Sequence, residues 1–194
     1  MTVVPRPLIV AATRAEAAHI PAGLEVLVTG IGKTAAATAL ARHLAGRGDL
    51  ADLVVVNLGT AGGLRDGLHD GLGDGLRDGL HEIGAVINHD INADAIRALG
   101  YDPRERLTIG PSPTVLATGD VFVTDPMVRS RLAERAQLVD MEGYAVAYVA
   151  QEFSVPVRLV KHVSDNADEG AWEWAALVDR SARALGRWAE THLG

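Results

Sequence analysis

The chain contains no cysteine, which excludes thiolate catalysis, disulfides and cysteine-ligated zinc. Aromatic residues are scarce, with three Trp, three Tyr and two Phe among 194 residues. Positively charged residues are also few: the chain has 18 Lys and Arg but 25 Asp and Glu, which gives a net charge of −7. Without a basic stripe, no nucleic-acid partner is expected. No apolar run reaches membrane-spanning length, so no membrane partner is expected either.

Small apolar residues dominate what is present, and 48% of the chain is hydrophobic. The length suits one domain over residues 1–194 with a substantial core. The first 20 residues, MTVVPRPLIVAATRAEAAHI, lack a charged segment followed by a long apolar core. They do not resemble a signal peptide, and the sequence therefore predicts a soluble cytoplasmic protein.

Short apolar runs alternate with helical patterns along the chain, which predicts an α/β fold. Runs such as LVVVNL and VRLVKHV are continuously apolar, as in parallel strands covered on both faces. We expect a single domain with a central mixed, mostly parallel sheet flanked by helices. The expected strands are 7–12, 24–29, 52–58, 83–88, 114–118, 137–140 and 155–163, and the expected helices are 31–46, 92–99, 125–136, 141–153 and 170–191.

Residues 65–80 form a low-complexity segment, RDGLHDGLGDGLRDGL, with Gly at every fourth position. The glycines argue against a helix, and Asp-Gly pairs favour turns. The spacing matches neither an EF-hand nor the glycine-rich calcium repeat. The segment is predicted to be an expanded surface loop.

Two acids stand out in residues 138–169, which read as a helix start, a buried strand and an Asp at the strand's end. One helix and one strand separate Glu142 from Asp165. Neighbouring parallel strands would bring both to the same carboxyl edge, where open α/β sheets bind ligands. Two carboxylates in one cleft suit acid/base chemistry on a bond that breaks with cationic character. These residues indicate an enzyme, although Asp165 could also be a helix N-cap.

Two glycine-rich segments follow predicted strands. GIGKT at 30–34 lacks the first glycine of a P-loop, and the strand after it ends at Asn57, without the ribose-binding acid of a dinucleotide fold. No nicotinamide cofactor is therefore expected, and the segment is a glycine turn entering an Ala-rich helix. NLGTAGGL at 57–64 offers backbone N–H groups and the Thr60 hydroxyl to a ligand, or is a plain connecting turn.

Other chemically active side chains have simpler interpretations. His89 and His162 show no metal-ligand spacing, so no metal is expected. Trp172, Trp174 and Trp188 fit the packed face of the last helix better than a stacking platform. Taken alone, Glu16 is more typical of a solvated first-turn helix residue.

In their order along the chain, these pieces resemble the nucleoside phosphorylase superfamily, and most of all its hydrolytic branch, the 5′-methylthioadenosine/S-adenosylhomocysteine nucleosidases. The matching segments span the chain: Glu16 after the first strand, GIGKTAAA at 30–37, NLGTAGGL at 57–64, TGDVFV at 118–123, VDMEGYA at 139–145 and VSDNAD at 163–168. The resemblance implies hydrolysis of the N-glycosidic bond of a purine nucleoside without a cofactor, by a homodimer.

The resemblance also implies a role for each site residue. Asp165, aided by Ser164, would protonate N7 of the purine; Glu142 would hold the ribose hydroxyls, with Met141 against the sugar. Glu16 would activate water. The remaining residues expected to bind substrate are Phe122 on the base, Val123 at its edge, Thr60, Asp140 and Lys161.

The same resemblance favours water over phosphate. Phosphorylases of the superfamily have Arg where this chain has Asn57, and another arginine aligns roughly with Glu16. Three departures remain: Lys161 stands in place of an Arg, the usual hairpin after the first helix is missing, and the segments closing the sugar's 5′ end differ. Alternatives are therefore a phosphorylase using Lys33, Lys161 or Arg14, a futalosine hydrolase, and a non-catalytic nucleoside-binding module.

Overall fold

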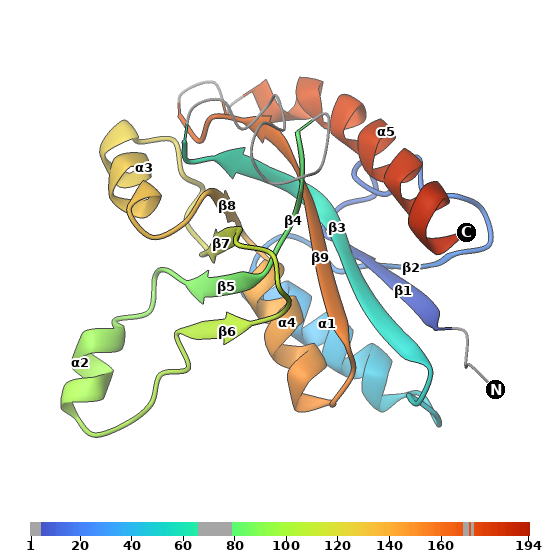
Figure 1. Ribbon diagram of the computed structural model, residues 1–194, viewed down its shortest axis with the longest axis horizontal. Helices are drawn as coiled ribbons and strands as arrows, with labels where there is room; N and C mark the ends of the chain where they lie inside the picture. Colours follow the sequence, from blue (N-terminus) through green and yellow to red (C-terminus); the bar gives the residue numbers. More distant parts are fainter. Residues whose placement is uncertain (1–4, 66–78, 169–170, 172) are drawn as a thin grey trace.

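A mixed β-sheet forms the centre of the protein (Figure 1). The computed structural model describes residues 5–65, 79–168, 171 and 173–194. Within these residues the strands are β1 (Arg6–Ala11), β2 (Glu25–Val28), β3 (Leu53–Gly63), β4 (Leu80–Glu82), β5 (Ala85–Asn88), β6 (Arg106–Thr108), β7 (Val115–Thr118), β8 (Leu138–Asp140) and β9 (Val157–Asp165). The helices are α1 (Lys33–Ala45), α2 (Ala93–Ala98), α3 (Pro126–Ala133), α4 (Gly143–Glu152) and α5 (Trp174–Leu193).

The strand order is β2-β1-β3-β8-β7-β5-β6, and β9 pairs with both β3 and β4. The pairs β1–β2, β1–β3, β3–β9, β5–β7 and β7–β8 are parallel. The pairs β3–β8, β4–β9 and β5–β6 are antiparallel. The predicted α/β fold with a mixed, mostly parallel sheet is confirmed.

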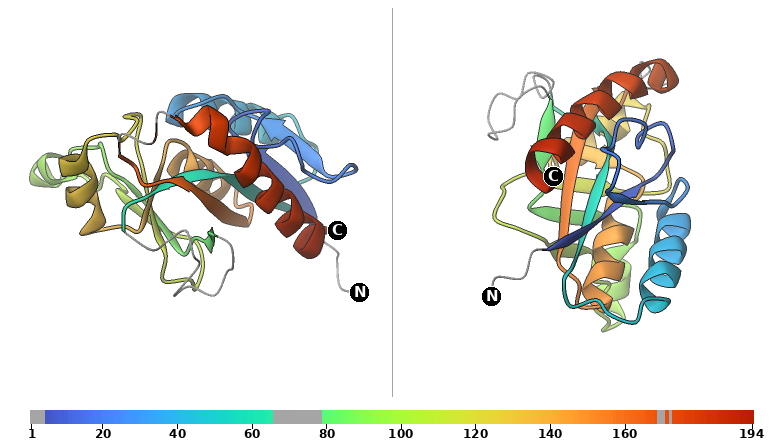
Figure 2. Two further views of the ribbon diagram at one scale, coloured as in Figure 1. Left: turned by 90° about the horizontal axis from the view of Figure 1, so that it is seen from above. Right: turned by 90° about the vertical axis from the view of Figure 1, so that its right-hand side faces the viewer.

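Helices cover both faces of the long strands, as Figure 2 shows. Because side chains alternate along a strand, Leu8 and Val10 pack with α1 and α4, whereas Ile9 packs with Trp188 of α5. All three strand residues are fully buried. Burial of each side chain of this size contributes about 1.5–3 kcal/mol, which explains why these strands are continuously apolar.

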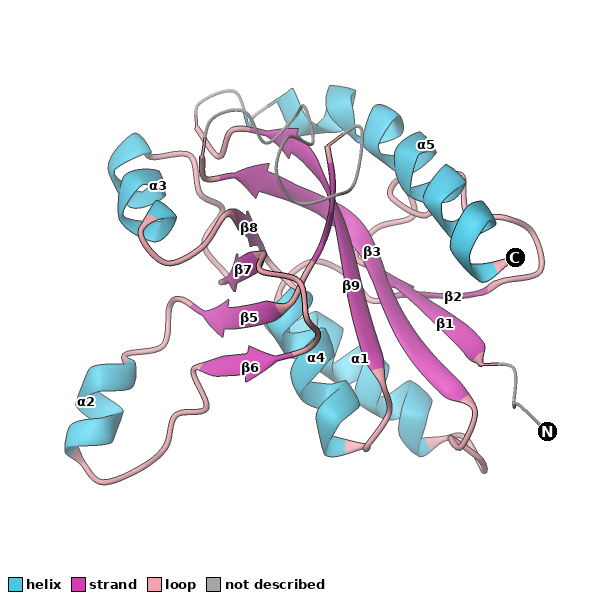
Figure 3. Ribbon diagram, viewed as in Figure 1, coloured by secondary structure: helices cyan, strands magenta, loops and turns pink. Residues whose placement is uncertain are grey.

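The strands form two groups that differ in length (Figure 3). β1, β3 and β9 are long, whereas β5 to β8 are short. α3 begins where the Asp125 side chain accepts from the N–H of Met127 and Pro126 occupies the first turn, a typical start signal. None of the described helices has the length and apolarity to cross a membrane.

Most of the expected elements are present, with three corrections. Residues 57–63 are the second half of β3 and not a connecting turn, since they pair with β9 on one side. β4 and β6 were not predicted, because three residues are too few to show a period. The DGL segment lies almost wholly outside the described residues.

The third correction concerns how the two acidic segments meet. β8 and β9 are not neighbouring parallel strands, because β3 pairs with both of them. The register of β9 on β3 shifts between Ala61 and Gly62, where Ser164 of β9 is the extra residue. The acids still reach one edge of the sheet, because Gly62 at the end of β3 pairs with Asp165 of β9 and with Val139 of β8.

Candidate active site

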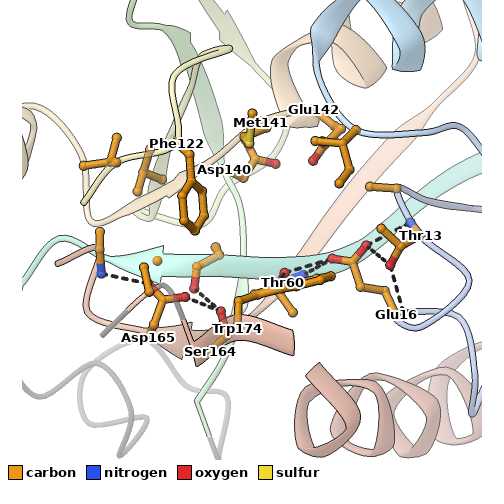
Figure 4. A pocket seen from close by; sticks show the side chains of 18 of the residues that line it. Thr13, Glu16, Thr60, Phe122, Asp140, Met141, Glu142, Ser164, Asp165 and Trp174 are labelled. Carbon is orange, nitrogen blue, oxygen red and sulfur yellow. Dashed lines mark hydrogen bonds between the residues drawn. The ribbon is translucent and has the colours of Figure 1, made fainter. Parts of the chain in front are cut away.

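A cavity of about 360 Å³ opens where β1, β3, β8 and β9 reach the same edge of the sheet (Figure 4). Its size is typical of small-molecule sites. The lining residues are Ala12, Thr13, Glu16, Ile31, Thr60, Ala61, Gly62, Val121, Phe122, Val123, Val139, Asp140, Met141, Glu142, Ser164, Asp165, Ala167, Ala171, Trp174 and Ala175. Each strand delivers its last residues or the loop after it.

Glu16 is held by four hydrogen bonds. Its Oε1 accepts from the backbone N–H of Thr60 at 2.8 Å and from the Thr60 hydroxyl at 2.9 Å. Its Oε2 accepts from the N–H and hydroxyl of Thr13, both at 3.1 Å. The side chain belongs to the turn after β1 and is only 4% exposed. The expectation of a solvated helix residue is therefore wrong, since this turn folds the carboxylate inward.

Asp165 ends β9 and points into the cavity beside Ser164 (Figure 4). Its Oδ2 accepts from the Ser164 hydroxyl at 2.6 Å, and its Oδ1 accepts from the N–H of Ala167 at 2.8 Å. A Cβ at Gly62 would lie 3.2 Å from Asp165 Oδ1 and 2.8 Å from the Ala167 side chain. The glycine in β3 therefore gives this acid its space.

Glu142 has a much sparser environment. Its Oε1 accepts from the N–H of Gly32 at 2.8 Å, which ties the segment after β8 to the GIGKT turn. Gly32 has φ of 96°, a conformation that glycine adopts without strain. Burial raises the pKa of Glu142 to about 7, and the nearby charge of Asp140 adds to this effect against the opposing charge of Lys161.

Asp140 and Lys161 form a buried ion pair next to Glu142. Lys161 Nζ lies 2.9 Å from Asp140 Oδ2, and each side chain is 1% exposed. Asp140 also accepts from the Thr118 hydroxyl at 2.6 Å and from the N–H of Gly143 at 2.8 Å, where α4 begins. Burial alone would lower the pKa of Lys161, but Asp140 and Glu142 raise it overall.

The cavity also has an apolar side. Met141 sits between the two acids of the β8 segment, and Val123 is 5% exposed. Phe122 and Val121 follow β7 and are 41% and 58% exposed. Ile31, from the GIGKT turn, is 59% exposed. An acidic interior thus has an apolar rim open to solvent.

The structure brings the predicted site residues together, apart from Lys161. Glu16, Glu142 and Asp165 line the cavity, as do the predicted substrate-binding residues Thr60, Phe122, Val123, Asp140, Met141 and Ser164. Lys161 is not among the lining residues and lies behind Asp140.

Trp174 was missed by the sequence interpretation. It lines the cavity at the start of α5 and donates from Nε1 to the Thr60 hydroxyl at 2.9 Å, whereas Trp188 packs in the core as expected. Trp172 is outside the described residues. Hydrophobic periodicity could not separate these tryptophans, because it reports the buried face of a helix and not which end meets a cavity.

The cations proposed to bind phosphate lie elsewhere. Lys33 Nζ donates to Asn88 Oδ1 at 2.8 Å and pairs with Asp90. Arg14 is exposed and is not a lining residue. The described lining residues include four carboxylates and no Lys, Arg or His. In the described part of the chain, no group of His, Cys, Asp and Glu has the arrangement of a metal site.

Fold and site together define an α/β protein with a carboxylate-lined pocket at a sheet edge. The chain matches the family model described as Phosphorylase superfamily over residues 82–192, more than half its length. It belongs to that superfamily.

The chain is similar in sequence to two kinds of nucleosidase. An aminodeoxyfutalosine nucleosidase from Helicobacter pylori is 29% identical over 129 residues, covering 55% of this chain and 56% of that protein. The match therefore spans little more than half of that relative. A 5′-methylthioadenosine/S-adenosylhomocysteine nucleosidase from Shewanella halifaxensis is 29% identical over 166 residues, covering 76% and 71%.

Solved structures share the fold. A Helicobacter pylori 5′-methylthioadenosine/S-adenosylhomocysteine nucleosidase in complex with a small molecule superposes with a TM-score of 0.79 at 24% identity, over 97% of each chain. The native futalosine hydrolase of the same organism gives 0.77 at 24% identity, over 98% of each chain. The described strands and helices therefore follow the arrangement of these enzymes.

Proposed function

We propose that the chain hydrolyses the N-glycosidic bond of a purine nucleoside, releasing the free base and a ribose derivative. The observation that carries this proposal is the charge of the cavity: four carboxylates and no cation among its described lining residues. Such a lining offers no cation to a phosphate dianion and favours a transition state in which the sugar becomes cationic. The relatives named as nucleosidases support the same chemistry.

Departure of the base requires an acid. Asp165 would donate a proton to N7 of the purine, so that the base leaves neutral as the glycosidic bond lengthens. The Ser164 hydroxyl, 2.6 Å from Oδ2, would orient the carboxyl group. Phe122 would lie against the base, with the backbone of Val123 at its edge.

The sugar and the water require the other two acids. Glu142 would hold the ribose 2′ and 3′ hydroxyls, and Met141 would pack on the ring. The single hydrogen bond from Gly32 leaves Glu142 with spare acceptor capacity for those hydroxyls. Glu16 would position the attacking water and accept its proton. Thr60 would fix Glu16, and Asp140 would fix the segment that carries Glu142. Lys161 would neutralise the charge of Asp140 without lining the cavity.

The substrate we favour is a 5′-methylthioadenosine- or S-adenosylhomocysteine-like nucleoside, as in the names of the Shewanella relatives. A futalosine-type nucleoside is the second candidate, supported by the Helicobacter relatives. Phosphorolysis is disfavoured because Lys33 and Lys161 are engaged by Asp90 and Asp140. We also propose that the enzyme is a cytoplasmic homodimer, whose partner covers the exposed rim of Ile31, Val121 and Phe122.

Release of free base tests the reaction. The protein is incubated with methylthioadenosine, S-adenosylhomocysteine, adenosine, inosine and futalosine, with and without phosphate. Release that does not depend on phosphate is expected. Strict phosphate dependence would indicate a phosphorylase, and binding without release would indicate a non-catalytic module.

Replacing the acid tests the mechanism. Asp165→Asn should lower kcat by about 10²–10⁴-fold, the usual contribution of a general acid, while calorimetry still detects nucleoside binding. Ser164→Ala, which removes only the orienting hydroxyl, should cost less. Full activity of Asp165→Asn would remove Asp165 from the mechanism.

A further inference from the structure

Trp174 connects the start of α5 to Glu16 through the side chain of Thr60. Its indole Nε1 donates to Thr60 Oγ1 at 2.9 Å, and the same hydroxyl lies 2.9 Å from Glu16 Oε1. Figure 4 shows this line of three side chains along one side of the cavity. The contact joins helix α5, strand β3 and the turn after β1, which are far apart in sequence.

The direction of each hydrogen bond in this line is determined by the donors. An indole N–H can only donate, so the Thr60 oxygen must accept from Trp174. A hydroxyl has a single proton, and the remaining partner of Thr60 is Glu16. The Thr60 hydroxyl therefore donates to Glu16 Oε1, beside the Thr60 N–H that donates to the same atom.

The second oxygen of Glu16 is constrained by the same logic. The backbone N–H of Glu16 donates to Thr13 Oγ1 at 3.2 Å, so the Thr13 hydroxyl is free to donate its own proton to Oε2. The Thr13 N–H donates to that oxygen as well. All four partners of the carboxylate are donors, so both of its oxygens act as acceptors.

We propose that Trp174 is a positioning residue for Glu16, which acts by fixing the direction of the Thr60 O–H bond. With the indole in place, Thr60 cannot turn its proton away, and Glu16 stays an acceptor ready to take a proton from water. The inference rests on the proposed function, because it presumes that Glu16 serves as the base.

Other charged groups also act on Glu16 and limit the expected effect. A Cβ at Gly59 would lie 3.1 Å from Glu16 Oε1 and 3.2 Å from Lys161 Nζ, so the buried ammonium faces the carboxylate across this glycine. Lys161 and Glu142 both interact electrostatically with Glu16. Loss of the indole N–H removes one constraint on Glu16 and leaves the others, so activity should fall without being abolished.

Kinetics of Trp174→Phe, Thr60→Val and the double variant test the proposal. Trp174→Phe keeps a ring but loses the donor, and kcat should fall roughly three- to tenfold, the size of one hydrogen bond, with KM little changed. In the Thr60→Val background, Trp174→Phe should have no further effect, because its path to Glu16 is already cut.

Two results would overturn the proposal. An equal loss from Trp174→Phe in both backgrounds would show that the indole does not act through Thr60. A rise in KM with kcat unchanged would show that it contacts substrate instead. Trp188→Phe, a matched change on the same helix but away from the cavity, should leave the kinetics unchanged.

A spectroscopic measurement keeps this test separate from the proposed reaction. In ¹⁵N-labelled protein, the indole N–H signal that disappears in Trp174→Phe should shift and exchange faster in Thr60→Val. An unmoved signal would contradict the hydrogen-bond chain. Failure of the wild-type protein to release base from any nucleoside would instead overturn the proposed function, and with it the role of Glu16 as base.

Discussion

Glu16 and Glu142 are both buried acids at the same sheet edge, 4% and 8% exposed, but their surroundings differ. Glu16, between β1 and β3, accepts four hydrogen bonds from Thr13 and Thr60. Glu142, after β8, accepts one from Gly32, and burial raises its pKa to about 7. A carboxylate that accepts four hydrogen bonds is held in a fixed direction, whereas a sparsely bonded one has acceptor capacity left for a ligand.

Among the variants that test this difference between Glu16 and Glu142, Glu16→Gln should have the largest effect. The amide NH₂ would face N–H and O–H groups that all donate, so one side of the group loses two hydrogen bonds. We expect kcat to fall by about 10²–10⁴-fold, as for loss of a general base. Base release measures the effect, and thermal unfolding should show a destabilisation of about 1–3 kcal/mol. A stable, fully active variant would show that the saturation of Glu16 has no consequence.

Lys161→Met should have an effect of nearly the same size, but on the free energy of unfolding and not on kcat. It leaves Asp140 buried without its cation, and breaking one partner of a buried pair costs about 3–5 kcal/mol. Denaturant unfolding measures this loss. The control is Arg183→Met, which breaks a pair with Asp179 whose side chains are 59% and 60% exposed and should cost below about 1 kcal/mol. Equal losses would mean that burial does not distinguish the two pairs.

Glu142→Gln should change how stability depends on pH. The folded-state pKa is raised from 4.5 to about 7, so the native protein binds a proton more tightly than the unfolded chain. The resulting stability is fully present below pH 4.5 and is lost as pH rises through about 7, a change of about 3 kcal/mol. Between about pH 5 and about pH 8, the free energy of unfolding should depend less steeply on pH in the variant than in the wild-type protein. Identical slopes would contradict the raised pKa.

The smallest effect should come from Gly32→Ala, which disturbs the single partner of Glu142. The positive φ at this site and a Cβ 3.1 Å from Asp120 Oδ1 should cost about 1 kcal/mol. KM should rise by roughly threefold while kcat stays close to wild type. Gly23→Ala is the matched control, since φ there is 101° but nothing lies within 4 Å of the added Cβ. It should lose similar stability and leave KM unchanged, and a KM effect in both would exclude the Glu142 explanation.

Much of the fold could be predicted because long strands and helices have their own periodicity. β1, β3, β9 and α1 carry buried apolar runs or an Ala-rich helix after a glycine turn, which are local signals. β4 and β6 have three residues each and depend on pairing with β9 and β5. Their strand character comes from the neighbour, so no local pattern could reveal them.

Asp165 and Glu142 could be predicted to share a site because each stands at or just after a strand end, and strand ends are visible in the sequence, whereas Glu16 was expected in the site only from the resemblance. Asp165 closes β9 and Glu142 follows β8. Their protonation could not be predicted, since it depends on burial and on Asp140 and Lys161, which tertiary structure brings near. Trp174 escaped notice because its partner Thr60 is 114 residues away.

The sequence by itself determined the α/β class, the order of the elements and the acids at the strand ends, because these depend on residue type and short-range spacing. Only the tertiary structure decided which acid is saturated and which is free to bind. The end of β3 that pairs with both β8 and β9, the buried position of Lys161 and the indole beside Thr60 arise from packing between distant segments. Hydrogen-bond direction and desolvation act over a few ångströms, so they are defined only once the chain has folded.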